Sequence, residues 1–133
     1  MAIYVAKQFK ITVLEKSTDT FIEYLLLNIN VGGVKILVGI IYRPPNACGF
    51  NEIAEMLNQH LLQYMNIVLM RDFNYNILKS YLFNQFKHFW DNYNLNFIHN
   101  NIPTHFTPST ETCSLLNLFM VSNPTIPLRL QHN

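Results

Sequence analysis

A short apolar run that ends in polar side chains is the feature that most limits how this chain can fold. Residues 67–70 are all apolar, and Asp72 and Asn74 follow them closely. A continuous apolar run of this length is typical of a strand buried on both faces in an α/β fold. Such folds place their ligand-binding side chains where the strands end. The run therefore predicts an α/β protein with polar groups at one edge of its sheet.

The rest of the sequence predicts helices and strands in a mixed order. We expect helices over residues 51–64 and 78–93, where apolar residues recur every three or four positions, and Asn51 as the N-cap of the first. Gly32 and Gly33 between two β-rich runs predict a hairpin. Residues 102–112, rich in Thr, Ser and Pro, are expected to form a loop. The expected strands are residues 2–5, 11–14, 21–31, 34–42, 67–70, 94–99 and 115–121.

Composition sets limits on the kind of protein. The chain has 133 residues, of which half are hydrophobic and 13% are charged, so we expect a single domain over residues 1–133 with a buried core. A net charge of +1 gives no general attraction for nucleic acids, although a local basic patch can act without a global excess. Cys48 and Cys113 lie far apart, which favours free thiols in an intracellular chain. No run is long and apolar enough to span a bilayer, so no membrane partner is expected.

The polar pair after the apolar run has a possible chemical use. In extended geometry Asp72 and Asn74 point to the same side, while Phe73 turns away to pack. A carboxylate can take a proton and an amide can donate hydrogen bonds to an anionic centre, which suits phosphate ester chemistry. The same residue types also occur in plain turns, and that interpretation stays open.

Other candidate groups favour structural roles. The five histidines show no metal-ligand spacing, so zinc is not expected. Aromatic residues at helical spacing could stack on bases, but a core position is the interpretation we prefer. These aromatic residues are Phe83, Phe86, Phe89 and Trp90.

Five segments, taken in order, resemble the endonuclease domain of non-LTR (LINE-type) retrotransposons, which accompanies a reverse transcriptase. This domain belongs to the endonuclease/exonuclease/phosphatase superfamily. The resemblance implies a partial four-layer α/β sandwich, in which two mixed sheets pack face to face with helices outside. It also implies a magnesium-dependent hydrolase that nicks DNA in the nucleus. The segments are residues 2–5, 35–46, 67–74, 103–107 and 114–122.

The resemblance also implies roles for individual residues. Asp72 and Asn74 would position the attacking water and hold the scissile phosphate, and Tyr42 would line the phosphate site. Asn117 stands where the family has a catalytic aspartate, so it completes the expected catalytic set. Substrate contacts are expected from Arg43, Asn46, Arg71 and Thr107.

The sequence departs from the family pattern at several points. Arg71 replaces a glycine and would add charge beside the phosphate site. The family's Ser-Asp-His segment is missing, and so is the metal-binding glutamate that precedes the segment at residues 2–5, so no metal ligand is assigned. We therefore expect a truncated endonuclease domain with weak or no activity. The alternative is a non-catalytic remnant that binds DNA or a protein. Self-association through an exposed sheet edge is also expected.

Overall fold

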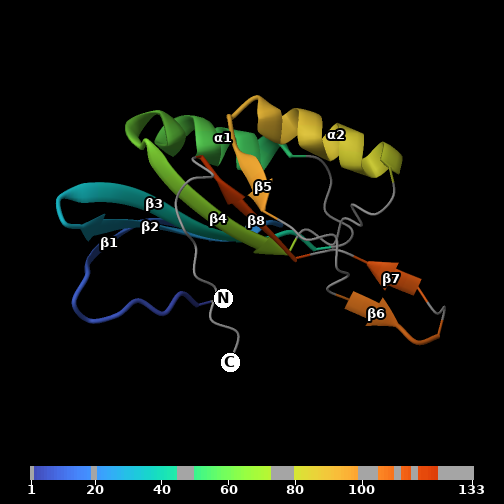
Figure 1. The fold of residues 1–133 in the computed structure, drawn as a ribbon, viewed down its shortest axis with the longest axis horizontal. Helices are drawn as coiled ribbons and strands as arrows, with labels where there is room; N and C mark the ends of the chain where they lie inside the picture. Colours follow the sequence, from blue (N-terminus) through green and yellow to red (C-terminus); the bar gives the residue numbers. More distant parts are fainter. Residues whose placement is uncertain are drawn as a thin grey trace.

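A computed structural model describes residues 2–18, 21–44, 50–72, 80–98, 105–109, 112–114 and 117–122. The elements are β1 Lys10–Lys16, β2 Glu23–Val31, β3 Val34–Tyr42, α1 Asn51–His60, η1 Leu61–Gln63, β4 Asn66–Asp72, α2 Ser80–Asp91, β5 Asn96–Ile98, β6 His105–Thr107, β7 Thr112–Ser114 and β8 Asn117–Val121. They form a six-stranded sheet in the order β1-β2-β3-β4-β8-β5 and a separate pair, β6-β7. The α-helices α1 and α2 cover the same face of the large sheet (Figure 1). The expected α/β class is confirmed.

The first three strands of the sheet form an antiparallel meander. Val31 pairs with Val34, and the turn between them has positive φ angles at Gly32 (57°) and Gly33 (85°). Glycine adopts this left-handed region without strain, and two such residues in succession suit a two-residue hairpin turn. The side-chain Oδ1 of Asn30 accepts a hydrogen bond from the Gly33 backbone amide at 3.0 Å. The hairpin that the glycine pair predicts is therefore confirmed.

The helix α1 connects the parallel strands β3 and β4. Its apolar residues recur every three or four positions, as expected, and they are buried against the sheet. The N-cap is Phe50, and Asn51 is the first helical residue, so the expected capping role of Asn51 is wrong. The Phe50 ring stacks on Phe89 of α2 at 4.9 Å, so packing between the two helices accompanies the start of α1. The buried residues of α1 are Ile53, Met56 and Leu57.

The remaining strands of the large sheet come from the second half of the chain. β4 pairs with β8, and β8 pairs with β5, both antiparallel. Residues 78–79, where α2 was expected to begin, lie outside the described residues. Trp90 of α2 is fully buried, which confirms the core position expected for it. The side chains of Phe83 and Phe86 are not among those described.

Two expectations about local structure are wrong. Residues 2–6 form no strand, because they pair with no strand in the described part of the chain. Residues 105–107, within the region expected to be a loop, form β6, which pairs with β7 at the end of that region. In both places the outcome depends on whether a pairing partner lies nearby, and that is a property of the tertiary structure.

The core lies between the large sheet and the helices. Alternate residues of the central strands point toward the helices, as the period of two in a strand requires. At Gly39, a Cβ atom would lie 2.7 Å from the Cδ2 atoms of both Leu26 and Leu69, so the absence of a side chain lets these leucines close over the strand. The helices described here are neither long nor apolar enough to cross a membrane. The core residues contributed by the sheet include Leu26, Leu37, Ile41, Ile67 and Leu69.

Candidate active site at the strand ends

The residues predicted to be catalytic occupy one row across neighbouring strands. Tyr42 lies opposite Asp72 in the parallel pair of β3 and β4. Asp72 in turn lies opposite Asn117 in the antiparallel pair of β4 and β8. Since neighbouring strands run about 4.8 Å apart, the backbones of all three residues fall within roughly 10 Å. The sheet register therefore unites three positions that are far apart in the sequence, and we call them the strand-end row.

The row sits where the strands end. Tyr42 is the last residue of β3, and Asp72 is the last residue of β4. The backbone amide of Arg43 donates a hydrogen bond of 2.9 Å to the carbonyl oxygen of Asp72, which ties the two strand ends together. Tyr42 and Asp72 are both partly exposed. The sequence thus places polar side chains at the open end of two apolar strands, as the apolar run at residues 67–70 predicted.

Arg71 lies on the opposite side of the sheet from Asp72. Its side chain is only 5% exposed, and its Cζ atom lies 4.5 Å from the ring centre of Trp90 and 5.2 Å from that of Phe97. Burial lowers the pKa of the Arg71 guanidinium well below its usual value, and the faces of the two rings stabilise its cationic form. Because successive side chains of a strand alternate between faces, Arg71 and Asp72 cannot share a surface. The structure therefore corrects the expectation that Arg71 contacts the substrate.

The other expected substrate contacts are only partly described. The Arg43 guanidinium lies 5.6 Å from the ring centre of Phe50, beside the strand-end row. Asn46 and Asn74 lie outside the described residues. Thr107 belongs to the small β6-β7 pair, and its side chain, like that of Asn117, is not described. The contacts expected from Arg43, Asn46 and Thr107 stay predictions.

The described side chains do not form a metal site. Among them, no three or more His, Cys, Asp or Glu side chains come together in a way that could hold a metal ion. Asp72 is the carboxylate of the strand-end row, and Glu23 lies opposite Tyr42 in the antiparallel pair of β2 and β3, so a second carboxylate stands in the same register. A protein holds magnesium through one or two carboxylates, while water and substrate phosphate complete the coordination. Asp72 and Glu23 are therefore the described carboxylates that would take part in holding the magnesium ion that the resemblance implies.

A cavity of about 430 Å³ lies at the other end of the sheet. Its lining includes Ile67, near the start of β4, and Ser122, which follows β8. The Ser122 hydroxyl accepts a hydrogen bond from the Ile67 amide at 2.9 Å and donates one to the Met65 carbonyl at 2.8 Å. The lining holds no Asp, Glu, His or Cys. This cavity is thus separate from the strand-end row, and no carboxylate, imidazole or thiol is among the described residues that line it.

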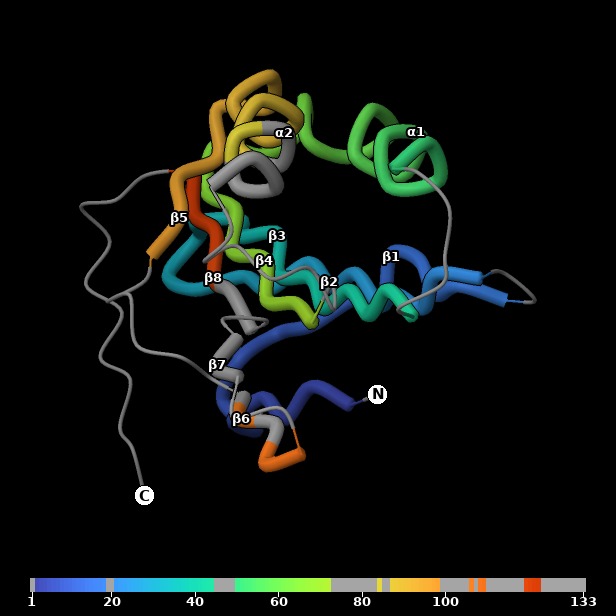
Figure 2. The backbone as a smooth tube through the Cα atoms, turned by 90° about the vertical axis from the view of Figure 1, so that its right-hand side faces the viewer, coloured from blue at the N-terminus to red at the C-terminus, as the bar shows by residue number. Residues whose placement is uncertain are grey.

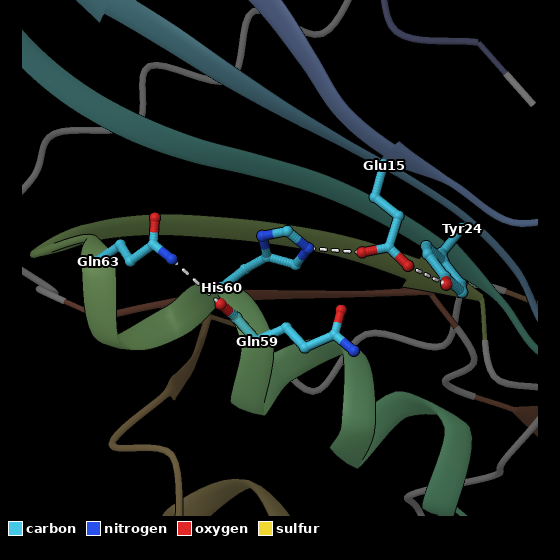
Figure 3. A network of polar contacts seen from close by, with 5 residues as sticks. All are labelled: Glu15, Tyr24, Gln59, His60 and Gln63. Atoms are coloured by element: carbon cyan, nitrogen blue, oxygen red, sulfur yellow. Dashed lines mark hydrogen bonds and ion pairs between the residues drawn. The ribbon is translucent and has the colours of Figure 1, made fainter.

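A second polar cluster, which sequence reasoning missed, joins β1, β2 and α1 (Figure 3). The Tyr24 hydroxyl donates a hydrogen bond of 2.5 Å to Oε1 of Glu15, and Nε2 of His60 lies 2.5 Å from Oε2 of the same carboxylate. The register of β1 shifts between Val13 and Glu15, so that Glu15 lies opposite Leu26 of the helix-facing core. A bulge of this kind re-aims a side chain. The periodicity of apolar residues in the sequence does not reveal this bulge.

Within this cluster the carboxylate and the phenol shift each other's pKa. The hydrogen bond from Tyr24 is the largest cause that lowers the pKa of Glu15; burial opposes it, and the contact with His60 lowers the pKa further. Burial, and then the hydrogen bond to ionised Glu15, raises the pKa of Tyr24 from 10.0 to about 12. Glu15 and Tyr24 lie opposite Leu26 and Ile41 of the helix-facing core, so the cluster is on the other face of the sheet from Tyr42, and we assign it a structural role.

Comparisons with known proteins show what the fold resembles. Neither protein-family models nor curated protein sequences gave a match. Among solved structures, the fold is similar to the endonuclease domain of TRAS1, a telomere-specific non-LTR retrotransposon, with a TM-score of 0.65 and 10% identity over 86% of this chain and 56% of that chain. It is also similar to the inositol polyphosphate 5-phosphatase domain of SPsynaptojanin, with a TM-score of 0.56 and 11% identity over 89% of this chain and 47% of that chain.

A third similar structure carries the family description itself. It is an endonuclease/exonuclease/phosphatase family protein from Bacteroides thetaiotaomicron, with a TM-score of 0.52 and 14% identity over 85% of this chain and 52% of that chain. The chain thus spans about half the length of the solved chains that it matches. Over that half, this chain has the fold of the endonuclease/exonuclease/phosphatase family.

Proposed function

We propose that the strand-end row is the phosphate-binding part of a phosphodiester hydrolase site that acts on DNA. The observation that carries this proposal is the register that places Tyr42, Asp72 and Asn117 side by side. The fold supports it, since one solved neighbour is a retrotransposon endonuclease domain and another is a phosphatase domain. Both names describe proteins that act on phosphate esters. A DNA substrate would place the protein in the nucleus.

Hydrolysis of a phosphodiester needs a base that takes a proton from water and hydrogen-bond donors that bind the phosphate oxygens. The Asp72 carboxylate accepts a proton from the attacking water, whose oxygen forms the new bond to phosphorus. The Tyr42 phenol and the Asn117 amide donate hydrogen bonds to the phosphate oxygens, where negative charge increases as the ester bond breaks. The leaving oxygen takes its proton from solvent. Each residue type thus has a defined task in hydrolysis.

The metal dependence has weaker support. The solved phosphatase domain holds inositol (1,4)-bisphosphate and a calcium ion. Among the described residues of this chain, no three His, Cys, Asp or Glu side chains come together to hold a metal, so we assign no step to a metal. A magnesium ion would need oxygen ligands from residues beyond those described or from the substrate. We retain magnesium as the cation to supply in an assay.

A non-catalytic role is the second candidate. It rests on the row itself, whose phenol and amide can bind phosphate oxygens without cleaving the ester. In that case the row would bind DNA phosphates without cleaving them, or the fragment would bind another protein. Losing one member of a cooperating catalytic set can lower the rate by orders of magnitude. Binding of DNA without its cleavage would identify the non-catalytic role.

Nicking of supercoiled plasmid in the presence of magnesium tests the proposal. The variant is Asp72→Asn, and its matched control is Asp91→Asn, an exposed carboxylate on α2 that pairs with Lys87 at 2.6 Å. We expect slow nicking by the wild-type protein and the control, and its loss in Asp72→Asn. Nicking that is the same in both variants would contradict the role of Asp72.

The same samples separate the second candidate from the first. Fluorescence anisotropy with labelled DNA would measure binding in the absence of magnesium, at several salt concentrations. Binding that weakens with salt, together with no nicking from a folded sample, would establish the non-catalytic role. Neither binding nor nicking would contradict both candidates that involve DNA.

A further inference from the structure

The cavity of about 430 Å³ at the other end of the sheet has no task in the proposed hydrolysis. Its lining comes from the end of α1 with η1, the start of β4, the turn after α2 and the residue that follows β8. Figure 2 shows α1 and α2 above the same face of the sheet, and the C-terminal ends of both helices contribute to the cavity. Its volume falls within the range of about 300–1,000 Å³ that is typical of small-molecule sites. We call it the far cavity.

The inner wall of the far cavity is apolar and partly aromatic. Leu57, Leu61 and Ile67 line it, and all three are buried. Tyr64 and Tyr93 line it as well, and both are partly buried. Aliphatic and aromatic side chains of this kind form the walls against which the ring of a ligand packs. The inner wall therefore suits a ligand that contains a planar ring.

The outer part of the far cavity carries amides. Asn58, Asn92 and Asn94 all belong to its lining, and all three are exposed. Each of these amides offers two N–H donors and one acceptor oxygen. Among the described residues that line the cavity there is no Asp, Glu, His, Lys or Arg. The far cavity can therefore form hydrogen bonds with a neutral ligand, but its described lining provides no charge to pair with a phosphate or an ammonium group.

Backbone hydrogen bonds fix the walls of the far cavity. The amide of Tyr93 donates to the Trp90 carbonyl at 3.0 Å, and the amide of Tyr64 donates to the Leu61 carbonyl at 3.2 Å. Asn94 has a φ angle of 53°, in the left-handed region that asparagine adopts more readily than most residues. Burial raises the pKa of the Tyr93 phenol, so this hydroxyl stays protonated and can donate a hydrogen bond. A ligand that enters the cavity would thus have few groups to order, which favours binding.

We propose that the far cavity binds a neutral nucleobase, either as the free base or as a nucleoside. The donor and the acceptor of an asparagine amide match the edge of adenine, which presents an amino donor beside a ring-nitrogen acceptor. Aromatic side chains such as Tyr64 and Tyr93 provide faces on which a base stacks. A base within a DNA strand is flanked by phosphates that would find no cation in the described lining. The far cavity therefore differs from the strand-end row in its ligand, and this proposal does not depend on the proposed function.

Titration of the protein with adenosine, followed through the backbone amide signals by NMR, tests the proposal. We expect the amides of Asn58, Ile67 and Ser122, at the far cavity, to shift together, while those of Tyr42 and Asp72 stay unchanged. Free adenine should shift the same signals if the base is what the cavity binds. Ribose alone should shift none of them, and adenosine monophosphate should bind no more tightly than adenosine.

A pair of matched variants tests the role of the amides. The variant is Asn58→Ala, and its control is Asn84→Ala, an exposed asparagine on α2 that is not part of the cavity lining. Both substitutions remove an exposed amide from a helix, so both proteins should fold, which circular dichroism would verify. We expect the dissociation constant for adenosine to rise about fivefold in Asn58→Ala, as the loss of one hydrogen-bonding group implies, and to stay unchanged in the control.

Four outcomes would overturn the proposal. The first is the absence of any shift at the far cavity up to the solubility limit of adenosine. The second is an equal weakening of binding in the two variants, which would mean that the amide of Asn58 does not contact the base. Tighter binding of the monophosphate would show that the site recognises phosphate. Shifts caused by ribose alone would show that it recognises sugar hydroxyls instead of a base.

Discussion

On one face of the large sheet, Leu37 and Ile41 are shielded from water by the helices, whereas Val13 and Val34 on the other face remain exposed. Both faces are apolar, so composition does not distinguish them. What distinguishes them is the layer that the chain packs above each one. The face under the helices forms the core, whereas the opposite face has exposed apolar residues on the edge strand β1 and beside the β2-β3 turn. Stability is therefore expected to respond more to substitutions under the helices than to substitutions at those exposed positions.

The largest expected effect comes from the same substitution on each face. Ile41→Ala, under the helices, should lower the free energy of unfolding by about 2–5 kcal/mol, because it leaves a cavity in the core. Ile11→Ala, at a position that is 48% exposed on the opposite face of the sheet, should change it by less than about 1 kcal/mol. Urea unfolding measures both. Equal losses of unfolding free energy in the two variants would contradict the distinction between the two faces.

A smaller effect is expected from acid, through the cluster that ties β1 and β2 to α1. The pKa of Glu15 is lowered from its ordinary value of 4.5, so its ionised form stabilises the fold at higher pH. This contribution is complete above about 4.5 and is lost as the pH falls through the lowered pKa of the folded state. We expect Glu15→Gln to reduce the acid dependence of stability below pH 4.5.

The control for the acid experiment is Glu52→Gln, an exposed carboxylate at the start of α1. Urea unfolding across a pH series would compare both variants with the wild type. In alkali the sign reverses, since the raised pKa of Tyr24 makes its contribution disappear as the pH rises from 10.0 toward about 12. Identical acid profiles for Glu15→Gln and the wild type would show that the cluster does not stabilise the fold.

The parts of the fold that the sequence predicted depend on local signals. The Gly32-Gly33 turn, the strand β3 and the apolar spacing of α1 need only neighbouring residues to define them. The β6-β7 pair and the irregular residues 2–6 depend on whether a partner strand lies beside them. Such pairings are a tertiary property, and one sequence carries little information about them.

In the candidate site too, some features follow from local sequence signals and others depend on the tertiary structure. The alternation of side chains along a strand, which was used to predict the orientation of Phe73, applies equally to Arg71, so the buried position of Arg71 could have been predicted from strand periodicity. The resemblance to the family implies a charged group beside the phosphate site, whereas the parity of position 71 along the strand places Arg71 in the core. The alignment of Tyr42 with Asn117, across β4, could not be predicted without the strand order. The bulge that turns Glu15 inward had no sequence signal.

The central claim is that the strand-end row forms one phosphate-binding site. The most direct test is to titrate the protein with inorganic phosphate and with a short DNA strand while recording the backbone amide signals by NMR. We predict that the amides of Tyr42, Asp72 and Asn117 shift together, with one dissociation constant, while Ile67 and Ser122 at the other end of the sheet stay unchanged. Shifts confined to that other end, or independent shifts in the row, would contradict the account.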